Sequence, residues 1–177
     1  MRDIIIYAAA SANGFIAKED GNVEWLDLIP NPEQSDYGYF DFYKSIDTTL
    51  MGNNTYREVL GFDVPFPYPD KTNYVFTRDT RLNQDRNVKY ISGDIVAFTK
   101  ELKNKTGKDI WLVGGGEINS LMLKHGLVNR IHLHLMPYVF GKGIPLFSPD
   151  LGDTRLKLES SHRYSSGVLE LKYVIDS

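Results

Sequence analysis

The chain has no cysteine among its 177 residues. Disulfides, thiol catalysis and cysteine-ligated metal sites are therefore all excluded, and we expect a cytoplasmic protein. An excess of positive charge is also missing, because the formal net charge is -3 and the lysines and arginines are scattered. This composition gives no electrostatic support for nucleic-acid binding.

Long apolar runs are absent as well, so no transmembrane helix is expected. The first ten residues hold a short apolar run, but it contains Asp3 and Tyr7 and no cleavage-type sequence follows it, which argues against a signal peptide. The hydrophobic content of 42% and the charged content of 24% are typical of a globular protein. We expect residues 1–177 to form a single domain.

The strand pattern predicts an α/β fold. Continuous apolar runs at residues 4–10 and 110–113 are typical of strands buried on both faces of a parallel sheet. Further strands are predicted at 48–51, 72–76 and 88–91, and they alternate with helices at 36–46, 55–60 and about 95–105. Such alternation indicates parallel strands joined by right-handed crossovers.

The last third changes character. Residues 130–139 alternate between apolar side chains and others, and residues 156–164 and 168–175 flank Ser165-Ser166-Gly167 as a β-hairpin would. The sheet is therefore predicted to be mixed, with an antiparallel end. Residues 15–32 and 62–70 are expected to be loops, and Trp25 in the first is either a staple onto the core or a wall of a pocket.

Three glycines follow the strand at 110–113, and a helical pattern begins at Ile118. A turn of this kind lets backbone N–H groups at a helix start face a phosphate without hindrance from a Cβ atom. The spacing is neither that of a Rossmann fingerprint nor that of a P-loop. A close strand-to-helix crossover without a ligand is the structural alternative.

Two other junctions have a composition that suits the same dinucleotide: Gly52-Asn53-Asn54-Thr55 and Thr77-Arg78. Ligands of open α/β sheets bind beyond the carboxyl ends of the parallel strands, so the three loops are expected to form one crevice. Thr55 offers a hydroxyl group at a helix start, and Arg78 could pair with a phosphate. Taken singly, Thr55 could be only a helix cap and Arg78 only a solvated turn residue.

Asp36 is the carboxylate that we predict to be catalytic. The helix predicted over residues 36–46 has Ser35 as its cap, Asp36 in its first turn, and Tyr39, Phe40, Tyr43 and Ile46 on one face. A carboxylate beside a reducible C=N bond could hydrogen-bond the substrate ring and favour its protonation. A simple helix-start charge is the alternative role, and Asp41, Glu24 and Glu33 are alternative acids.

Metal and hydrolase chemistry have little support. His132 and His134 point to one face of a strand, but no third ligand accompanies them, and a polar face under a helix or at a subunit contact explains the pair. We expect no metal. Ser11, Ser120 and Ser148 lack the Gly-x-Ser-x-Gly elbow of a serine hydrolase.

Four segments together resemble the RibD C-terminal reductase family within the dihydrofolate reductase-like superfamily, over nearly the whole chain. Residues 11–17 (SANGFIA) look like the Ser-x-Asp-Gly-x-Ile-Ala stretch of that family, and residues 51–56 (MGNNTY) look like its Met-Gly-Arg-x-Thr-Tyr. Residues 114–116 match its Gly-Gly-Gly turn. Residues 137–147 (PYVFGKGIPLF) match its Pro-x-x-x-Gly-x-Gly-x-Pro-Leu-Phe signature.

The resemblance implies a three-layer α/β/α fold of the dihydrofolate reductase type, with NADPH as hydride donor and a cis peptide within the glycine turn. It implies a cofactor site with the nicotinamide near Ala9, Ala10 and Ile16. The adenosine phosphate would lie near Gly52, Asn53, Asn54, Thr55, Thr77 and Arg78. The pyrophosphate turn would comprise Val113, Gly114, Gly115, Gly116, Glu117 and Ile118.

On the substrate side, the resemblance implies that Trp25 and Phe40 contact the substrate and that Asp36 occupies the place of the pterin-binding acid. Two departures limit this comparison. Asn53 replaces a common basic residue, so that a preference for NADPH over NADH depends on Arg78. Residues 27–35 lack the arginines with which a riboflavin-pathway reductase would hold a ribose phosphate.

The sequence therefore predicts an NADPH-dependent reductase of a small heterocyclic substrate, with the 5-amino-6-(5-phosphoribosylamino)uracil reductase of riboflavin biosynthesis as the leading family activity. Dihydrofolate reductase activity is the alternative within this class. An NADPH-binding module without turnover and a protein-interaction domain are the alternatives from other classes. The family resemblance and the final hairpin also predict a homodimer.

Overall fold

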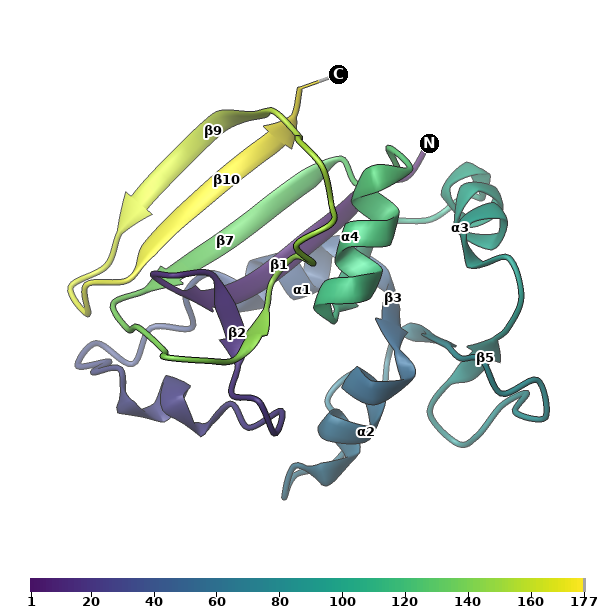
Figure 1. Ribbon diagram of the computed structural model, residues 1–177, viewed down its shortest axis with the longest axis horizontal. Coiled ribbons are helices and arrows are strands. Elements are labelled where there is room, and N and C mark those ends of the chain that lie inside the picture. Colours follow the sequence, from purple (N-terminus) through teal and green to yellow (C-terminus); the bar gives the residue numbers. More distant parts are fainter. Residues whose placement is uncertain (177) are drawn as a thin grey trace.

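Eight strands form one mixed sheet, in the order β5-β4-β3-β6-β1-β7-β10-β9, in the computed structural model, which describes residues 1–176 (Figure 1). The parallel part comprises β1 (Ile4–Ser11), β3 (Ile46–Gly52), β4 (Thr72–Phe76), β5 (Lys89–Ile91), β6 (Asp109–Gly114) and β7 (Arg130–Met136). The antiparallel end comprises β10 (Leu169–Ile175) and β9 (Leu156–Arg163). Both parts confirm the predicted mixed sheet.

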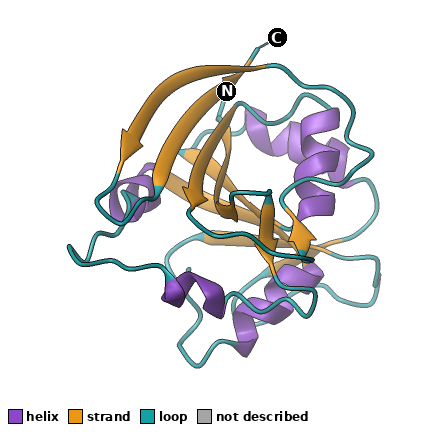
Figure 2. Cartoon of the chain, turned by 60° about the vertical axis from the view of Figure 1, so that its left-hand side comes forward, coloured by secondary structure: helices purple, strands orange, loops and turns teal. Residues whose placement is uncertain are grey.

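Helices cover both faces of this sheet, as the views in Figures 1 and 2 show. Ile4 and Ile6 of β1 pack in one core with α3 (Ile95–Asn104) and α4 (Gly116–Lys124). Ile5 between them faces a second core with α1 (Tyr39–Ser45) and α2 (Asn53–Gly61). This alternation explains why the run in β1 is apolar throughout. The predicted three-layer α/β/α fold is confirmed, and no helix within residues 1–176 is long and apolar enough to cross a membrane.

The start of the first helix was predicted wrongly. The chain enters α1 only at Tyr39, with Gly38 as its N-cap in the left-handed region, so Asp36 precedes the helix instead of lying in its first turn, and Ser35 is not its cap. Tyr39, Tyr43 and Ile46 pack against the core as predicted, but the inward face includes Phe42 in place of Phe40. Phe42 is buried, whereas Phe40 is 60% exposed with the ammonium group of Lys44 over its ring.

Residues 15–32 are not the structureless loop that the sequence predicted. They contain β2 (Phe15–Ala17) and the 3-10 helix η1 (Glu24–Leu28). The short β2 pairs with β8 (Ile144–Pro145) in a second, two-stranded sheet. Both strands are too short to give a periodic pattern, and each is defined by a partner more than a hundred residues away in the sequence.

Asn73 ties the loop of residues 62–71 to the sheet. It is 4% exposed, its Oδ1 accepts a hydrogen bond from Thr49 Oγ1 at 2.7 Å, and its Nδ2 lies 3.0 Å from the carbonyl oxygens of both Tyr68 and Lys71. Removing a buried partner leaves the remaining polar groups desolvated without compensation.

We expect Asn73→Leu to lower the free energy of unfolding by about 2 to 4 kcal/mol, because a buried hydroxyl group and three carbonyl groups, of Tyr68, Lys71 and Asn87, lose their partner. Urea unfolding followed by circular dichroism measures this change. Thr72→Leu, at the exposed neighbouring position of the same strand, is the matched control and should cost less than about 0.5 kcal/mol. Equal effects of the two substitutions would contradict this role of Asn73.

Candidate functional site

The predicted cofactor loops lie at one edge of the sheet. β1, β3, β4 and β6 are neighbours or near neighbours and run parallel, so the loops that follow them leave from the same edge. β6 lies between β1 and β3. From β3 the chain moves outward through β4 and β5, whereas after β6 it crosses to the far side of β1 and forms β7, so the direction of the connections reverses here. An open α/β sheet binds ligands at such a switch point.

The glycine turn after β6 requires glycine at two of its three positions, Gly114 and Gly116. The Gly114–Gly115 peptide is cis, which confirms the cis bond expected from the resemblance. Gly114 has φ +112°, and a Cβ on it would lie 3.2 Å from Oδ1 of Asn119. A Cβ on Gly116 would lie only 2.3 Å from the carbonyl oxygen of Pro145. Larger residues would therefore force two backbone segments apart.

The glycine turn and the start of α2 lie side by side, with room for little more than a hydrogen atom on the facing glycines. A Cβ on Gly115 would lie 3.4 Å from Thr55 Oγ1, and a Cβ on Gly52 would lie 3.2 Å from Cγ1 of Ile118. The N-termini of α2 and α4 are thus side by side, and each carries backbone N–H groups without helical partners. Two adjacent helix starts form a favourable environment for a group with more than one negative charge, such as a pyrophosphate.

Arg78 follows β4 at the same edge, next to β3 in the sheet. It is exposed, and within residues 1–176 it has no ion pair, whereas the neighbouring Asp79 is bonded to Arg81. The hydroxyl group of Thr77 accepts a hydrogen bond from the backbone of Asp79 at 3.0 Å and so shapes this turn. Arg78 is therefore a cation available to a ligand phosphate.

Two further family-like segments close the crevice on the β1 side. Asn13 Nδ2 donates to the carbonyl oxygen of Phe140 at 2.7 Å, and the backbone N–H of Leu146 donates to Gly14 at 2.9 Å. Asn119 on α4 also binds Leu146: its Nδ2 donates a hydrogen bond to the Leu146 carbonyl oxygen at 3.2 Å. All four segments singled out in the sequence therefore meet in one place.

Trp25 is a staple onto the core in this structure. It is 1% exposed, and its ring lies 4.9 Å from the ring of Phe140 and 5.6 Å from that of Tyr138, measured between centroids. Its Nε1–H donor is buried and has no partner within residues 1–176. Ala9, Ile29 and Tyr37 complete the partly buried margin of the same cluster. An unsatisfied buried donor of this kind is uncommon and can serve a ligand or a water molecule.

Asp36 lies at the entrance to α1. Its carboxylate accepts hydrogen bonds from the backbone N–H groups of Phe40 at 2.9 Å and Gly38 at 3.0 Å. These two bonds lower the pKa of Asp36, so its exposed side chain is an anion at neutral pH. As an anion, Asp36 can accept a hydrogen bond from a ligand N–H group but has no proton to donate.

The sequence did not identify a buried polar cluster under the start of α1. Tyr7, His134 and Glu170 lie on the same sheet face as α1, and His134 is 2% and Glu170 8% exposed. His134 Nε2 lies 2.9 Å from the carbonyl oxygen of Tyr37 and 3.7 Å from a carboxylate oxygen of Glu170. Only the spacing of His132 and His134 signalled this cluster, since their partners come from distant segments.

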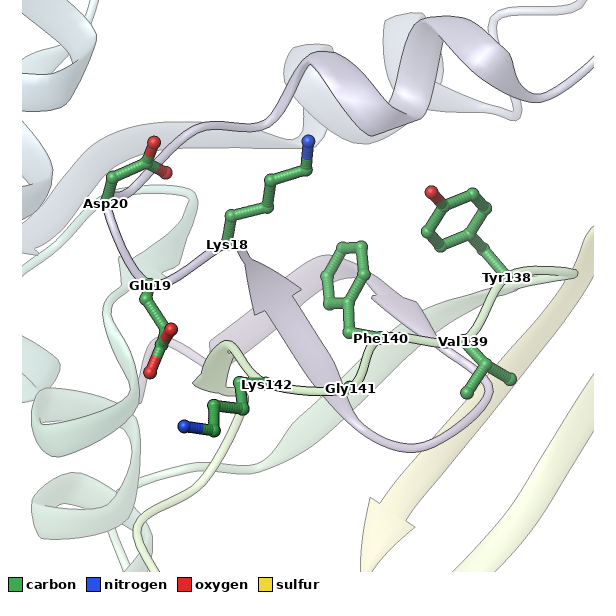
Figure 3. Close-up of a pocket in the computed structure, with 8 residues that line it drawn as sticks. All are labelled: Lys18, Glu19, Asp20, Tyr138, Val139, Phe140, Gly141 and Lys142. Carbon is green, nitrogen blue, oxygen red and sulfur yellow. The ribbon is translucent and has the colours of Figure 1, made fainter.

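An open pocket of about 520 Å³ lies outside the crevice, between residues 18–20 and 138–142 (Figure 3). It mixes Lys18 and Lys142 with Glu19 and Asp20, and Lys142 points away from the aromatic rings. None of the predicted cofactor-binding residues lines it. The candidate site is therefore the edge of the sheet where the predicted cofactor loops lie together, with the cis peptide and the closely packed glycines.

Comparisons with known proteins identify relatives of this chain. Residues 2–169 match the RibD C-terminal domain family. The uncharacterized protein YwjB of Bacillus subtilis (strain 168) is 39% identical over 173 residues, which cover 98% of each chain. The uncharacterized protein YyaP of the same organism is 33% identical over 184 residues. This match covers 97% of the present chain and 94% of YyaP.

Solved structures extend the comparison. A proposed riboflavin biosynthesis protein from Shewanella sp. PV-4 superposes with a TM-score of 0.88 at 27% identity, and 99% of each chain is covered. Dihydrofolate reductase from Enterococcus faecalis, complexed with NADP(H), shares the fold with a TM-score of 0.70 at 16% identity, over 99% of this chain and 97% of that one. The chain therefore belongs to the RibD C-terminal domain family.

Proposed function

We propose that this protein is an NADPH-dependent reductase that acts on a small heterocyclic substrate. The observation that carries the proposal is the close approach of the glycine turn to Thr55. It places the N-termini of α2 and α4 side by side, at the same edge of the sheet as Arg78. Membership of the RibD C-terminal domain family supports the same reading, and so does the fold shared with a reductase that binds NADP(H).

The residues of the crevice fit a nicotinamide dinucleotide. Gly115, Gly116, Glu117 and Ile118 would hold the pyrophosphate through backbone N–H groups, next to Val113 and Gly114. The adenosine phosphate would bind to Gly52, Asn53, Asn54, Thr55, Thr77 and Arg78. The nicotinamide would lie near Ala9, Ala10 and Ile16. Such a cofactor supplies hydride to the substrate.

On the substrate side, we propose that Asp36 accepts a hydrogen bond from a ring N–H group, beside Trp25 and Phe40. Phe40 is turned to solvent with Lys44 over its ring, so it would form an outer wall at most in this arrangement. Residues 21–43 contain five acidic residues and no lysine or arginine. This charge would repel a substrate phosphate, so phosphate-free heterocycles belong in the substrate screen beside the riboflavin-pathway pyrimidine and dihydrofolate.

We expect purified protein to bind NADPH, with quenching of the fluorescence of Trp25 and Trp111, and Arg78→Ala to weaken this binding about 10-fold with little effect on NADH. Arg81→Ala is the matched control, because Arg81 is on the same loop but is paired with Asp79. Tight binding without NADPH oxidation by any acceptor would instead indicate a binding module. Without binding of either nucleotide, the reductase proposal fails.

Asp36→Asn is expected to lower kcat at least about 10-fold while the Kd for NADPH changes less than about 2-fold. The amide keeps one acceptor for the turn before α1 but loses the charge. Steady-state kinetics with NADPH and fluorescence titration separate the two effects. Asp109→Asn removes the same charge at the start of β6, at the opposite end of that strand from the glycine turn, and should leave kcat unchanged. An unchanged kcat in Asp36→Asn would move the role to another acid or to water.

We also propose that the protein is a homodimer through the β9–β10 hairpin. Strand β9 is an edge of the sheet, and Leu156, Leu158 and Leu169 of the hairpin are 38%, 51% and 37% exposed. An exposed edge strand can pair with a second chain, and gathered exposed apolar side chains often mark an interface between proteins.

Sedimentation at micromolar concentration is expected to give a dimer, and Leu158→Glu is expected to shift it toward the monomer because a charge would enter an apolar interface. Ser160→Glu introduces the same charge on the same strand, opposite Lys172, and should have a smaller effect. A wild-type monomer would contradict the dimer proposal.

A further inference from the structure

The turn before α1, residues 34–38, has an unusual backbone. Gln34 has φ +51°, Tyr37 has φ +53° and Gly38 has φ +78°. The left-handed region is unfavourable for residues with a Cβ atom, so surrounding contacts must hold Gln34 and Tyr37 there. Asp36 lies within this turn, and the direction of its carboxylate depends on the turn.

Two partly or fully buried side chains of the sheet form hydrogen bonds to this turn. The carbonyl oxygen of Tyr37 accepts hydrogen bonds from Tyr7 Oη at 3.0 Å and from His134 Nε2 at 2.9 Å. Tyr7 is on β1 and His134 on the neighbouring β7, so both bonds originate from the rigid centre of the sheet. The hydroxyl group of Tyr37 reaches the other side and contacts Ser166 Oγ at 3.2 Å.

Both groups keep the protons that these bonds need. Burial raises the pKa of Tyr7, and burial lowers the pKa of His134, so near neutral pH the first is a phenol and the second a neutral imidazole. With its proton on Nε2, the imidazole donates to the Tyr37 carbonyl group. Glu170 lies 3.7 Å from the same nitrogen and is itself paired with Lys172 at 3.1 Å.

We propose that Tyr7 and His134 are positioning residues that fix Asp36 through the carbonyl group of Tyr37. This inference rests on the proposed reductase function, in which Asp36 faces the substrate. Neither residue is assigned a contact with substrate or cofactor. Their effect is geometric, because a misplacement of about 1 Å in a reacting or orienting group can cost about 100-fold in rate.

The test compares three variants with a matched control. Tyr7→Phe and His134→Met each remove one hydrogen bond and keep an apolar or aromatic body of similar size, whereas His134→Gln retains an N–H donor near the position of Nε2. His132→Met is the control, because His132 is on the same strand and face but has no hydrogen bond to residues 34–38 within the described chain.

Hydrogen exchange at the backbone amides of Gly38 and Phe40, which donate to Asp36, reports whether the turn is held. We expect exchange to be at least about 10-fold faster in Tyr7→Phe and His134→Met than in His132→Met, with protection restored in His134→Gln. Equal exchange in His134→Met and His132→Met would overturn the proposal, and this measurement needs no substrate.

Kinetics decide whether the held turn matters for turnover. We expect kcat to fall about 10- to 100-fold in Tyr7→Phe and His134→Met, with the Kd for NADPH within about 2-fold of the wild-type value, and kcat to recover in His134→Gln. A kcat like that of His132→Met would overturn the catalytic part. If the wild-type protein does not oxidise NADPH in the presence of any tested acceptor, the proposed function and this catalytic part fail together. Hydrogen exchange still decides whether the two side chains hold the turn.

Discussion

The crevice depends on how closely separate backbone segments approach one another at the carboxyl end of β6. A Cβ at Gly116 would lie 2.3 Å from the carbonyl oxygen of Pro145, and one at Gly143 would lie 2.5 Å from that of Ala17. Only residues without side chains permit both approaches. The β2–β8 pairing, and the contact between Gly14 and Leu146, follow from this proximity. Residues 143–146 are thus held beside the glycine turn and β2, although they come from a later loop of the chain.

The close packing leaves one polar atom of Asn119 without a hydrogen-bond partner within residues 1–176. Its Nδ2 bonds to the Leu146 carbonyl group, but its buried Oδ1 has no hydrogen-bond partner within residues 1–176. An isolated buried acceptor is unfavourable. The amide group therefore stabilises the junction of the two loops through its donor side only. Because Oδ1 lies against Gly114, any side chain on Gly114 would collide with it.

The parts of the fold that were predictable are those encoded by local patterns. Strand β4 was predicted at its observed limits, and the apolar runs of β1 and β6 were recognised because burial on both faces removes alternation. The start of α1 was predicted three residues too early because Ser35 is a good helix-capping residue by type and Asp36 is favoured in a first turn, whereas the observed turn depends on left-handed residues that no sequence pattern indicates. The cis bond after Gly114 came from the family resemblance alone.

The candidate site divides in the same way. The glycine turn, Thr55 and Arg78 follow strand ends, so local motifs and a parallel sheet were enough to group them. The cluster of Tyr7, Tyr37, His134 and Glu170 joins four segments through single hydrogen bonds or charge contacts. Such contacts leave no periodic signal, because each depends on register between strands and on one carbonyl group that happens to face them. Side-chain chemistry was therefore readable from the sequence, but its partners were not.

The electrostatics of the turn before α1 restrict the chemistry available there. Two backbone N–H groups stabilise the Asp36 carboxylate and lower its pKa, while its surface position keeps it in contact with water. A carboxylate in this state can orient a ring N–H group and stabilise positive charge that develops on the ring. It cannot itself supply the proton that accompanies hydride transfer to a C=N bond at neutral pH. In the proposed reaction that proton comes from water, so the role of Asp36 is to favour the protonated substrate and not to be its acid.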